Sequence, residues 1–366
     1  MPIYMDVHIV PGVKAKDVAE AHRKDLLHQG EFGCNCMTYW IDEKRDSIFC
    51  LIEASDKDAV KEMHSKAHGL VPNKIVEVSS SVVESFLGRI YDPEEAKTSE
   101  DGLKIFIDPS FRIILVTKID DPVLLQHQLG TEKANELISR HNEIARKNIS
   151  QHEGSEVEHG GSGFIVSFTS ATKAMACALA MQKDLPVQEA ALLGFKIGVN
   201  GGEPIEKSNK LFGDTIQFAN YYCSIAGHSQ VAMASNVKEL ASNELYQKNR
   251  GQLLSLSPQE ENFLQSLFSK LEEKWQDHDF ATADYCKAMA MSQSQFYRKT
   301  TSLTGSSFNS LLKDYRLEKA KEQMKKQGLS ISQVTFDSGF TSPSYFTKCF
   351  KKKYGLLPMA YIDLLH

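Results

Sequence analysis

The sequence predicts an α+β multidomain protein built from three units. Residues 1–90 and 105–245 alternate short strand-like runs with helical stretches, whereas residues 257–366 are helical almost throughout. A polar, acidic stretch over residues 91–104 is typical of a linker. The length of 366 residues also exceeds what one ordinary hydrophobic core supports. We therefore expect an N-terminal βαββαβ unit, a middle α/β unit and an all-α C-terminal unit.

The composition excludes several classes of protein. Hydrophobic residues make up 42% and charged residues 24%, as in soluble globular proteins. No run of eighteen apolar residues exists, and the N-terminus lacks a basic segment followed by an apolar stretch. The seven cysteines are scattered, which argues against a disulfide framework. We expect a cytoplasmic protein without a transmembrane helix.

The charge is unevenly distributed along the chain. The whole chain carries −5, but residues 292–354 contain twelve Lys and Arg against four Asp and Glu, a net charge of +8. The remaining residues therefore carry −13. A basic segment attached to an acidic body indicates a polyanion-binding module, although a solvated lysine-rich helix face would give the same pattern.

The N-terminal unit is predicted to contain four strands and two helices in βαββαβ order. This order is ferredoxin-like, and it leaves one face of the sheet free to pair with another subunit. The predicted elements cover residues 3–10, 14–29, 34–41, 47–54, 56–68 and 73–78.

Histidine and cysteine are concentrated in this unit, which holds five of the twelve histidines and three of the seven cysteines. Imidazole and thiolate groups suit transition metals. His64 and His68 lie four residues apart on one helix face, a spacing that lets two imidazoles share an ion. His22 falls on the apolar stripe of its helix, so a hydrogen-bonded core histidine is the alternative there. Cys34 and Cys36 lack the usual zinc-knuckle spacing and could be small buried residues.

Four segments of the N-terminal unit resemble a small family of nickel-responsive proteins. They are MDVHIVPG at 5–12, AEAH at 19–22, MTYWIDEKRDSIFCLIEA at 37–54 and MHSKAHGL at 63–70. The resemblance implies a bound transition metal, nickel or zinc, while a small-molecule or purely structural role is the alternative. The expected ligands are His8, His22, His64 and His68, with Tyr39 and Cys50 as further candidates.

Three segments that contain glycine motifs mark the middle unit. Taken singly, they are more typical of turns than of phosphate loops, because no Gly-Lys-Ser/Thr follows. Taken together, they resemble the catalytic domain of class III nucleotidyl cyclases over about residues 109–240. The segments are GGSGFIVSF at 160–168, GVNGGEP at 198–204 and LFGDTIQFANYY at 211–222.

The cyclase resemblance fails at the positions that carry the chemistry. That chemistry needs two carboxylates holding two metal ions on a triphosphate, and the matching positions here are Lys118 and Ser162. A cation and a hydroxyl cannot replace the two carboxylates. The asparagine and arginine that steady the transition state match Gln217 and Tyr221. We expect a cyclase-like domain that is not an enzyme and that dimerises, because cyclase domains resemble obligate pairs.

The C-terminal unit carries two helix-turn-helix patterns. Ser292 and Gln295 form a capping-box pattern that opens one helix. Ser342 and Pro343 supply an N-cap and a first-turn proline for another helix fifty residues later. Each helix follows a shorter one and a tight turn. The predicted second helices of the two motifs cover residues 293–303 and 343–354.

The outward side chains of these two helices are candidates for DNA contact. Lysines there would add sequence-independent, salt-sensitive affinity, whereas glutamine and arginine could read base edges. For any single lysine, a merely solubilising role is the alternative. The candidates are Gln293, Ser294, Gln295, Tyr297, Arg298, Lys299, Ser342, Ser344, Tyr345, Lys348, Lys351 and Lys352.

The C-terminal unit resembles the AraC/XylS DNA-binding domain. Three motifs carry the resemblance: MSQSQFYRKTTSLTG at 291–305, RLEKAKEQM at 316–324 and DSGFTSPSYFTKCFKKKYGLLPMAY at 337–361. The resemblance implies two recognition helices in one monomer that enter successive major grooves of double-stranded DNA.

These observations predict a sequence-specific DNA-binding transcription regulator. Its expected partners are double-stranded DNA, a second copy of the chain in a homodimer, and a metal ion or small ligand sensed by the N-terminal unit. A nucleotide-like ligand could also lie near Asp214 and Thr215, and no membrane partner is expected. Two alternatives are an active nucleotide cyclase and a metal-binding protein, each with an accessory DNA-binding tail.

Overall fold

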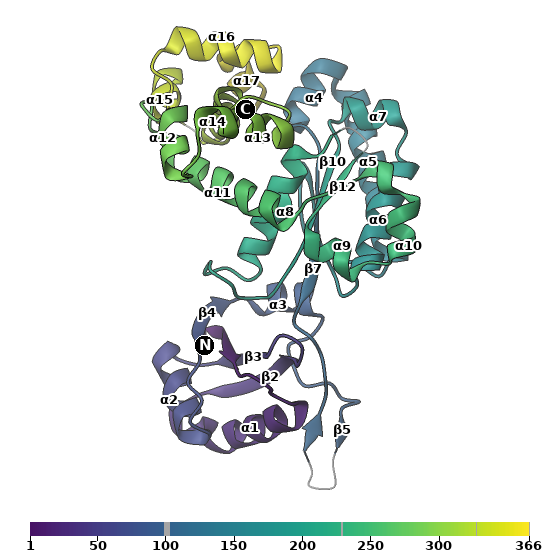
Figure 1. Ribbon diagram of the computed structural model, residues 1–366, viewed down its shortest axis with the longest axis vertical. Coiled ribbons are helices and arrows are strands. Elements are labelled where there is room, and N and C mark those ends of the chain that lie inside the picture. The colour runs from purple at the N-terminus through teal and green to yellow at the C-terminus, as the bar shows by residue number, and fades with distance from the viewer. Residues whose placement is uncertain (99–102, 228–229, 327, 366) are drawn as a thin grey trace.

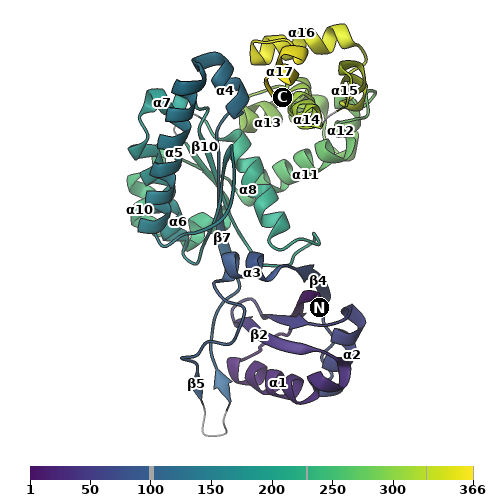
Figure 2. The ribbon, with the colours of Figure 1, turned by 180° about the vertical axis from the view of Figure 1, so that it is seen from behind.

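The computed structural model describes residues 1–98, 103–227, 230–326 and 328–365. In the opposite views of Figures 1 and 2, the N-terminal unit lies at the foot of the molecule and the middle unit above it, with the C-terminal helices packed beside the middle unit. The predicted α+β multidomain fold class is confirmed.

The N-terminal unit is a four-stranded antiparallel sheet with the strand order β2-β3-β1-β4. Two helices pack on one of its faces, and the element order is the predicted βαββαβ. Each predicted end falls within one residue of the observed end. The elements are β1 (Ile3–Ile9), α1 (Ala15–His28), the short η1 (Gln29–Phe32), β2 (Asn35–Asp42), β3 (Ser47–Glu53), α2 (Lys57–Ala67) and β4 (Lys74–Val78).

The second face of this sheet is covered by the chain itself, which corrects the expectation that it stays free for another subunit. Helix α3 (Ser80–Leu87) packs there, over the fully buried Trp40 and Phe49. Phe86 of α3 in turn contacts Phe212 of the middle unit, with ring centroids 4.8 Å apart. Since this apolar area is already buried, it is not available to a second copy.

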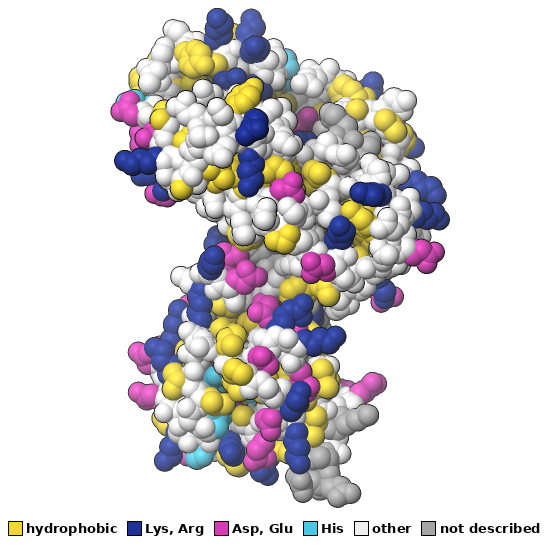
Figure 3. All heavy atoms as spheres, viewed as in Figure 1, with side chains coloured by type: hydrophobic (Ala, Val, Ile, Leu, Met, Phe, Trp, Pro, Cys, Tyr) yellow, Lys and Arg dark blue, Asp and Glu magenta, His cyan; other side chains and the backbone are white. Residues whose placement is uncertain are grey.

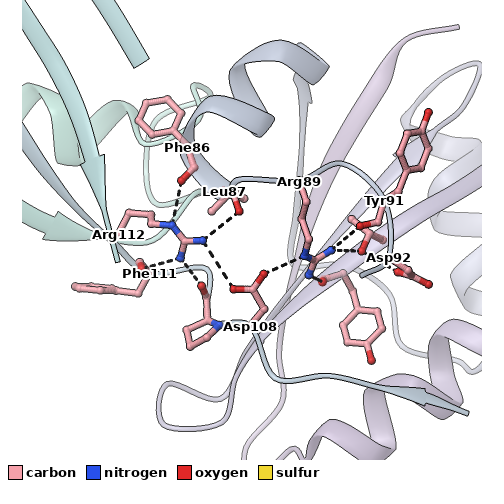
Figure 4. A network of polar contacts seen from close by, with 11 residues as sticks. Phe86, Leu87, Arg89, Tyr91, Asp92, Asp108, Phe111 and Arg112 are labelled. Atoms are coloured by element: carbon pink, nitrogen blue, oxygen red, sulfur yellow. Dashed lines mark hydrogen bonds and ion pairs between the residues drawn. The ribbon is translucent and has the colours of Figure 1, made fainter. Parts of the chain in front are cut away.

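The predicted linker after this unit is anchored at its start rather than free. Asp92 accepts a hydrogen bond from Thr38 Oγ1 of β2 at 2.8 Å. Arg89, just before it, pairs with Asp108 at 3.0 Å (Figure 4). Between Asp92 and Asp108 along the chain, the short strands β5 (Lys97–Thr98) and β6 (Lys104–Ile105) pair in antiparallel orientation.

Arg112 extends the same polar network to the middle unit (Figure 4). Its guanidinium donates to the carbonyl oxygens of Phe86 at 3.0 Å and Leu87 at 3.3 Å, at the C-terminal end of α3. These carbonyls lack partners inside the helix, so the arginine both satisfies them and complements the helix dipole. Because Arg112 is also the first residue of the central strand β7, the two units are fastened at a buried polar junction.

The middle unit is a six-stranded mixed sheet with the strand order β12-β11-β10-β7-β9-β8. The β10–β11 and β11–β12 pairings are parallel, and the other pairings described for this sheet are antiparallel. Helices α5 and α6 cover one face, where Ile113 and Leu115 point, and α8 covers the other, where Ile114 and Val116 point. The strands are β7 (Arg112–Lys118), β8 (Ser155–Gly160), β9 (Gly163–Phe168), β10 (Lys196–Gly202), β11 (Val231–Met233) and β12 (Leu253–Ser255). The helices are α4 (Pro122–Leu129), α5 (Thr131–Gln151), α6 (Ala171–Asp184), α7 (Val187–Leu192), α8 (Gly213–Ile225), α9 (Ser235–Leu240), α10 (Asn243–Lys248) and the short η2 (Arg250–Gln252).

The C-terminal unit contains two helix-turn-helix motifs joined by a long helix. The first motif is α12–α13 and the second is α15–α16. Phe296 is buried in the first motif, where Phe308 of the joining helix contacts it, and Phe346 and Phe350 are buried in the second. The helices are α11 (Pro258–Lys274), α12 (Thr282–Ala288), α13 (Gln293–Thr304), α14 (Phe308–Met324), α15 (Ile331–Asp337), α16 (Pro343–Tyr354) and α17 (Pro358–Leu365).

The C-terminal unit packs against the middle unit at two places. Helix α11 shares a core with α8, where the rings of Phe268 and Tyr221 stack with centroids 4.5 Å apart. Helices α14 and α17, which flank the second motif, contact Asp121, the N-cap residue of α4. Asp121 accepts a hydrogen bond from Tyr361 Oη at 2.9 Å and lies 3.6 Å from Lys321 Nζ.

Candidate DNA-binding surface and metal cavity

Helix α13 presents a polar face to solvent because its apolar side chains Phe296 and Leu303 pack into the core. Ser292 caps the helix through its Oγ, and Phe296 is fully buried. Tyr297 is 58% exposed, an unusual position for an aromatic side chain without a partner surface. The other exposed candidates on this helix are Gln293, Ser294, Gln295 and Arg298.

Two of the sequence candidates on α13 already have local partners. Gln295 Oε1 accepts hydrogen bonds from the backbone N–H and the hydroxyl of Ser292, at 3.2 and 3.1 Å. Lys299 is half-buried, with its ammonium 4.8 Å from the centroid of the Phe263 ring in α11. Arg298 is exposed beside them and lines a groove with Gln295 and Lys299. It is therefore the candidate on this helix best placed to read a base.

Helix α16 has the same arrangement, with Phe346 and Phe350 buried and a basic face outside. The Ser342 hydroxyl caps the helix by accepting from the backbone N–H of Tyr345 at 3.4 Å, and the Tyr345 side chain is 53% exposed. The remaining candidates, Ser344, Lys348, Lys351 and Lys352, lie on the outer side of the helix. Figure 3 shows Lys and Arg side chains at the top of the molecule, over this helix.

A neighbouring lysine of α16 differs from the three candidates. Lys353 turns back toward α14, where its ammonium lies 3.3 Å from Glu318 and 3.7 Å from Asp314. Its charge is therefore balanced within the domain. Lys353 can serve as a control for the three candidate lysines, whose charges face solvent.

The N-terminal unit holds a buried cluster of imidazole, carboxylate and thiol groups. His64 lies at its centre, with Nε2 at 2.9 Å from Asp6 Oδ2 and Nδ1 at 3.1 Å from Asp25 Oδ1. His68 Nε2 lies 3.1 Å from the same Asp25 oxygen, and His8 Nε2 lies 3.3 Å from Asp6 Oδ1. Asp6, Asp25 and His64 are at most 3% exposed. Two sets of atoms each lie within 4.8 Å of one another: Asp6, His8, Cys50 and His64, and Asp25, His64 and His68.

The protonation states in this cluster follow from burial opposed by charge. Burial alone would lower the pKa of His64, but the Asp6 charge and the hydrogen bonds to Asp25 and Asp6 outweigh it and raise the pKa to about 10. Burial likewise opposes ionisation of Asp6, yet its contacts with His64 and His8 hold its pKa well below the usual range. Burial and the charges of Asp6 and Asp25 raise the pKa of the Cys50 thiol. The cluster therefore holds a proton on His64 that an incoming cation would displace.

The donor set fits a transition metal. Asp6 Oδ1 is buried without a hydrogen-bond partner among the described residues, although it faces His8. A buried carboxylate oxygen with free lone pairs is costly unless something binds it. Imidazole nitrogen, carboxylate oxygen and cysteine sulfur are ligands of zinc and nickel.

The other predicted ligands lie at the edge of this cluster. His22 lines the same small cavity as His8 and Cys50, and its Nε2 lies 3.5 Å from Asp92 Oδ2. Tyr39 also lines the cavity, but its hydroxyl donates to the Lys104 carbonyl at 3.3 Å and so points away. The four predicted histidines and Cys50 are thus brought into one region, with Tyr39 turned toward the linker.

Sequence reasoning missed the carboxylates of this cluster. Asp6 alternates with His8 on β1, and Asp25 follows His22 by three residues on α1, so both share a face with a predicted ligand. These spacings were the available signal. Asp92 lies in the predicted linker, where no local pattern indicates a contact with His22.

In the middle unit, the two positions that matched cyclase carboxylates lie together but form no metal site among the described residues. Lys118 ends β7 and Ser162 lies in the β8–β9 turn, where its carbonyl accepts from the Ile119 N–H at 2.8 Å. Both residues line a shallow pocket, and among its described lining residues Glu158 is the single carboxylate. A lysine ammonium beside one carboxylate disfavours a divalent cation.

The other two matching positions face the C-terminal unit. Gln217 Nε2 donates to Glu272 Oε2 of α11, and Tyr221 stacks on Phe268 of α11.

The two residues considered for a nucleotide-like ligand, Asp214 and Thr215, also have polar contacts within the chain. Asp214 Oδ2 accepts from the Ser208 N–H at 2.7 Å, and the Thr215 hydroxyl lies 3.5 Å from a Glu206 oxygen.

Comparison with known protein families agrees with this arrangement. Residues 285–363 match the model of a helix-turn-helix domain, over the two motifs described here. This segment is a helix-turn-helix domain of the AraC type. Residues 4–78, which contain the buried cluster apart from Asp92, match the model described as nickel responsive protein SCO4226-like.

Individual proteins match one part of the chain each. The transcriptional regulator GadX of Escherichia coli K12 is 27% identical over 156 residues, which cover 38% of this chain and 57% of GadX. Putative adenylate cyclase 3 of Rhizobium meliloti is 31% identical over 110 residues, 28% of this chain and 18% of that protein. The solved structure of SCO4226 from Streptomyces coelicolor is 30% identical, covers 21% of this chain and 94% of its own, and has a TM-score of 0.20.

The three resemblances predicted from the sequence are confirmed by these matches. The chain spans less than two thirds of the length of GadX and of the putative cyclase. Across the part of the chain that the structure describes, every helix is too short or too polar to cross a bilayer.

Proposed function

We propose that this protein is a sequence-specific DNA-binding transcription regulator that senses a transition metal, nickel or zinc. The observation that carries the DNA-binding part is the exposure of the polar faces of α13 and α16. Both helices bury their phenylalanines and leave glutamine, arginine, tyrosine and lysine side chains free, in a segment of net charge +8. The similarity to GadX, a transcriptional regulator, supports the same role.

The test is selection of binding sites from random DNA by the full chain, followed by competition against unselected DNA. A regulator enriches a defined motif and prefers it by at least about 10³-fold. A metal-binding protein with an accessory tail would bind both DNAs equally, with affinity set by salt alone. Equal binding would therefore overturn the proposal.

Two substitutions assign the groove contacts. Arg298→Ala is expected to weaken binding to the selected site by about tenfold or more and to relax its sequence preference, because arginine reads base edges bidentately. Lys348→Ala is expected to weaken all sequences alike and to reduce the slope of log affinity against log salt by about one. Lys353→Ala is the matched control, since its charge is already balanced by Glu318. Unchanged binding by both variants would contradict the assignment.

The metal-sensing part rests on the buried cluster around His64. His64, His68, Asp25, Asp6, His8 and Cys50 would hold the ion, with His22 at the edge of the cavity as a further ligand. A bound ion would supply a positive charge that draws these side chains together. On binding an ion, His64 would give up its proton, and Asp6 and Asp25 would stay ionised and balance the charge. Elemental analysis of protein purified without an affinity tag identifies the metal, and a metal-free preparation that takes up neither nickel nor zinc would contradict this part.

We also propose that the middle unit is not an enzyme and that the DNA-bound form is a homodimer. The replacement of two carboxylates by Lys118 and Ser162 supports the first point. Incubation with ATP or GTP and Mg²⁺ or Mn²⁺ should give no cyclic nucleotide above background, and product formation would refute the proposal that the unit is not an enzyme.

The proposed homodimer is tested by sedimentation of the protein with and without the selected DNA. The second sheet face of the N-terminal unit cannot be its contact, because α3 covers it.

A further inference from the structure

Helix α8 contacts both other units. Its start lies toward the N-terminal unit, and further along it lies against α11 and α13 (Figures 1 and 2). Phe212, the residue that precedes α8, packs on Phe86 of α3. Tyr221 and Tyr222 of α8 belong to the core that α11 shares. One rigid helix therefore spans the distance between the proposed sensor and the DNA-binding unit.

The loop before α8 is held by one lysine of the N-terminal sheet. Lys74 Nζ donates to the backbone carbonyls of Glu206, Lys207 and Ser208, at 3.0, 2.8 and 2.6 Å. These three bonds use all three N–H donors of the ammonium. Hydrogen bonds from a charged donor are stronger than those from a neutral one, and the partial burial of Lys74 strengthens them further. Ser208 is tied in turn to α8, because its N–H donates to Asp214 at 2.7 Å. A displacement of Lys74 thus acts on the first turn of α8.

Lys74 is close in the chain to the metal cavity. His68, which lines the cavity, accepts a hydrogen bond at Nδ1 from the Leu70 N–H at 3.2 Å. The chain then passes through Asn73, whose N–H donates to the Val7 carbonyl at 2.8 Å, directly before Lys74. Val7 is the neighbour of His8 on β1. The start of β4 therefore lies between two contacts, His68 with Leu70 and Val7 with Asn73. Both contacts involve residues of the cavity or their direct neighbours, which would move if an ion bound there.

At its other end, α8 is joined to the DNA-binding unit by a polar and an aromatic contact. Gln217 donates to Glu272 in the last turns of α11, and Tyr221 stacks on Phe268 of the same helix at an interplanar angle of 16°. Helix α11 contacts α13 through Phe263 and Lys299. A shift of α8 therefore reaches the helix that carries Arg298.

We propose that α8 and the preceding loop, residues 203–212, are the device that transmits occupancy of the N-terminal cavity to the DNA-binding unit. Lys74 is the positioning residue at the sensor end, and the Gln217–Glu272 contact is the link at the reader end. This inference rests on the proposed function, because it takes the cavity to be the sensor. It requires that the loop and α11 respond together, through these contacts and not through the buried arginine junction at α3.

The test is hydrogen–deuterium exchange on the full chain, with nickel chloride alone as the probe. In the unmodified protein, nickel should change exchange in the loop and in α11 by at least about fivefold, the lower end of ordinary coupling energies. Lys74→Met should bind nickel with the same affinity by calorimetry and still protect the cavity, while the loop and α11 no longer respond. Glu272→Ala should leave the loop response intact and weaken the response of α11, where the Tyr221–Phe268 contact remains.

Lys57→Met is the matched control, because Lys57 is exposed on α2 and forms no hydrogen bond or ion pair within the described residues. Far-ultraviolet circular dichroism and the midpoint of thermal unfolding establish that each variant is folded. An α11 response in Lys74→Met that equals the response of the unmodified protein would overturn the inference.

A metal-free double-mutant cycle keeps the inference testable if nickel does not bind and the sensing proposal fails. His68→Ala disturbs the cavity wall directly, and its effect on α11 exchange is measured once in the otherwise unmodified chain and once in the Lys74→Met variant. Transmission through Lys74 requires that the effect seen in the unmodified chain disappears in the variant. Equal effects in both chains would reject the role of Lys74 independently of any metal.

Discussion

The N-terminal cavity and the pocket at Lys118 in the middle unit differ in the properties that metal binding requires. The cavity brings two carboxylates against three imidazoles and a thiol, nearly all shielded from solvent. The pocket is shallow, holds an ammonium group, and has Glu158 as the single carboxylate among its described lining residues. Resemblance to a family that uses metal ions is therefore weaker evidence for a metal site than a cluster of ligand atoms whose charge an ion can balance.

The largest expected effect is loss of the ion from the cavity. A His64→Ala, His68→Ala double variant removes two donors from the centre of the cluster and should weaken nickel or zinc binding by more than about 100-fold. Isothermal calorimetry of tag-free protein measures it. His28→Ala is the matched control, since this histidine of α1 pairs with Glu31 away from the cavity. Retained affinity in the double variant would place the ion elsewhere and remove the contrast between the two sites.

A smaller loss is expected from Asp92→Asn. Asp92 lies beside His22 and orients it, and loss of a partner that orients a ligand typically weakens metal binding by about tenfold or somewhat more. The same titration measures it, with Asp58→Asn on the surface of α2 as the control. An Asp92→Asn affinity equal to that of the unmodified chain would exclude His22 from the ligand set.

The pH dependence of unfolding of the metal-free protein should follow His64. Its pKa is raised from the ordinary 6.5 to about 10, so the stabilisation from its charged contacts is complete below about pH 6.5 and is lost as the pH rises through 10. We expect the midpoint of thermal unfolding of the N-terminal unit to fall by several degrees between pH 7 and pH 10. His64→Gln should unfold with a flatter pH profile over this range. If the pH profiles of His64→Gln and the unmodified protein run parallel, the loss of stability with rising pH comes from another group.

The smallest effect is expected at the middle pocket. Millimolar Mg²⁺ with ATP should leave the midpoint of thermal unfolding unchanged within about one degree, because ligands that do not bind the native state do not stabilise it. Nickel under the same conditions should raise the midpoint. A clear stabilisation by Mg²⁺ and ATP would show that Lys118 accommodates a nucleotide and would narrow the difference between the two sites.

Local features of the fold could be predicted closely from the sequence. The start of α13 follows from Ser292 and Gln295, and the start of α16 from Ser342 and Pro343, because each capping contact joins residues three apart. The same holds for His64 and His68, which one turn of α2 brings together. The exposed side chains of α13 and α16 also follow from helical periodicity alone.

The candidate site needed contacts that no local pattern contains. Asp6 and Asp25 reach His64 from 58 and 39 residues away. The Lys74 contact with the loop before α8 joins residues more than 130 positions apart. The expectation of a free sheet face was wrong because the covering residues belong to α3 and to the middle unit.

From the sequence by itself follow the prediction of three units, the two helix-turn-helix motifs, and the presence of Lys118 and Ser162 at the positions that resemble cyclase carboxylates. These features depend on residue identity and on spacings within a few turns of chain. The tertiary structure alone decided that carboxylates complete the histidine cluster, that α3 covers the N-terminal sheet and that α8 lies between the proposed sensor and the DNA-binding unit. Those arrangements arise from packing between segments distant in sequence, where burial and charge pairing select one geometry among many that the local patterns allow.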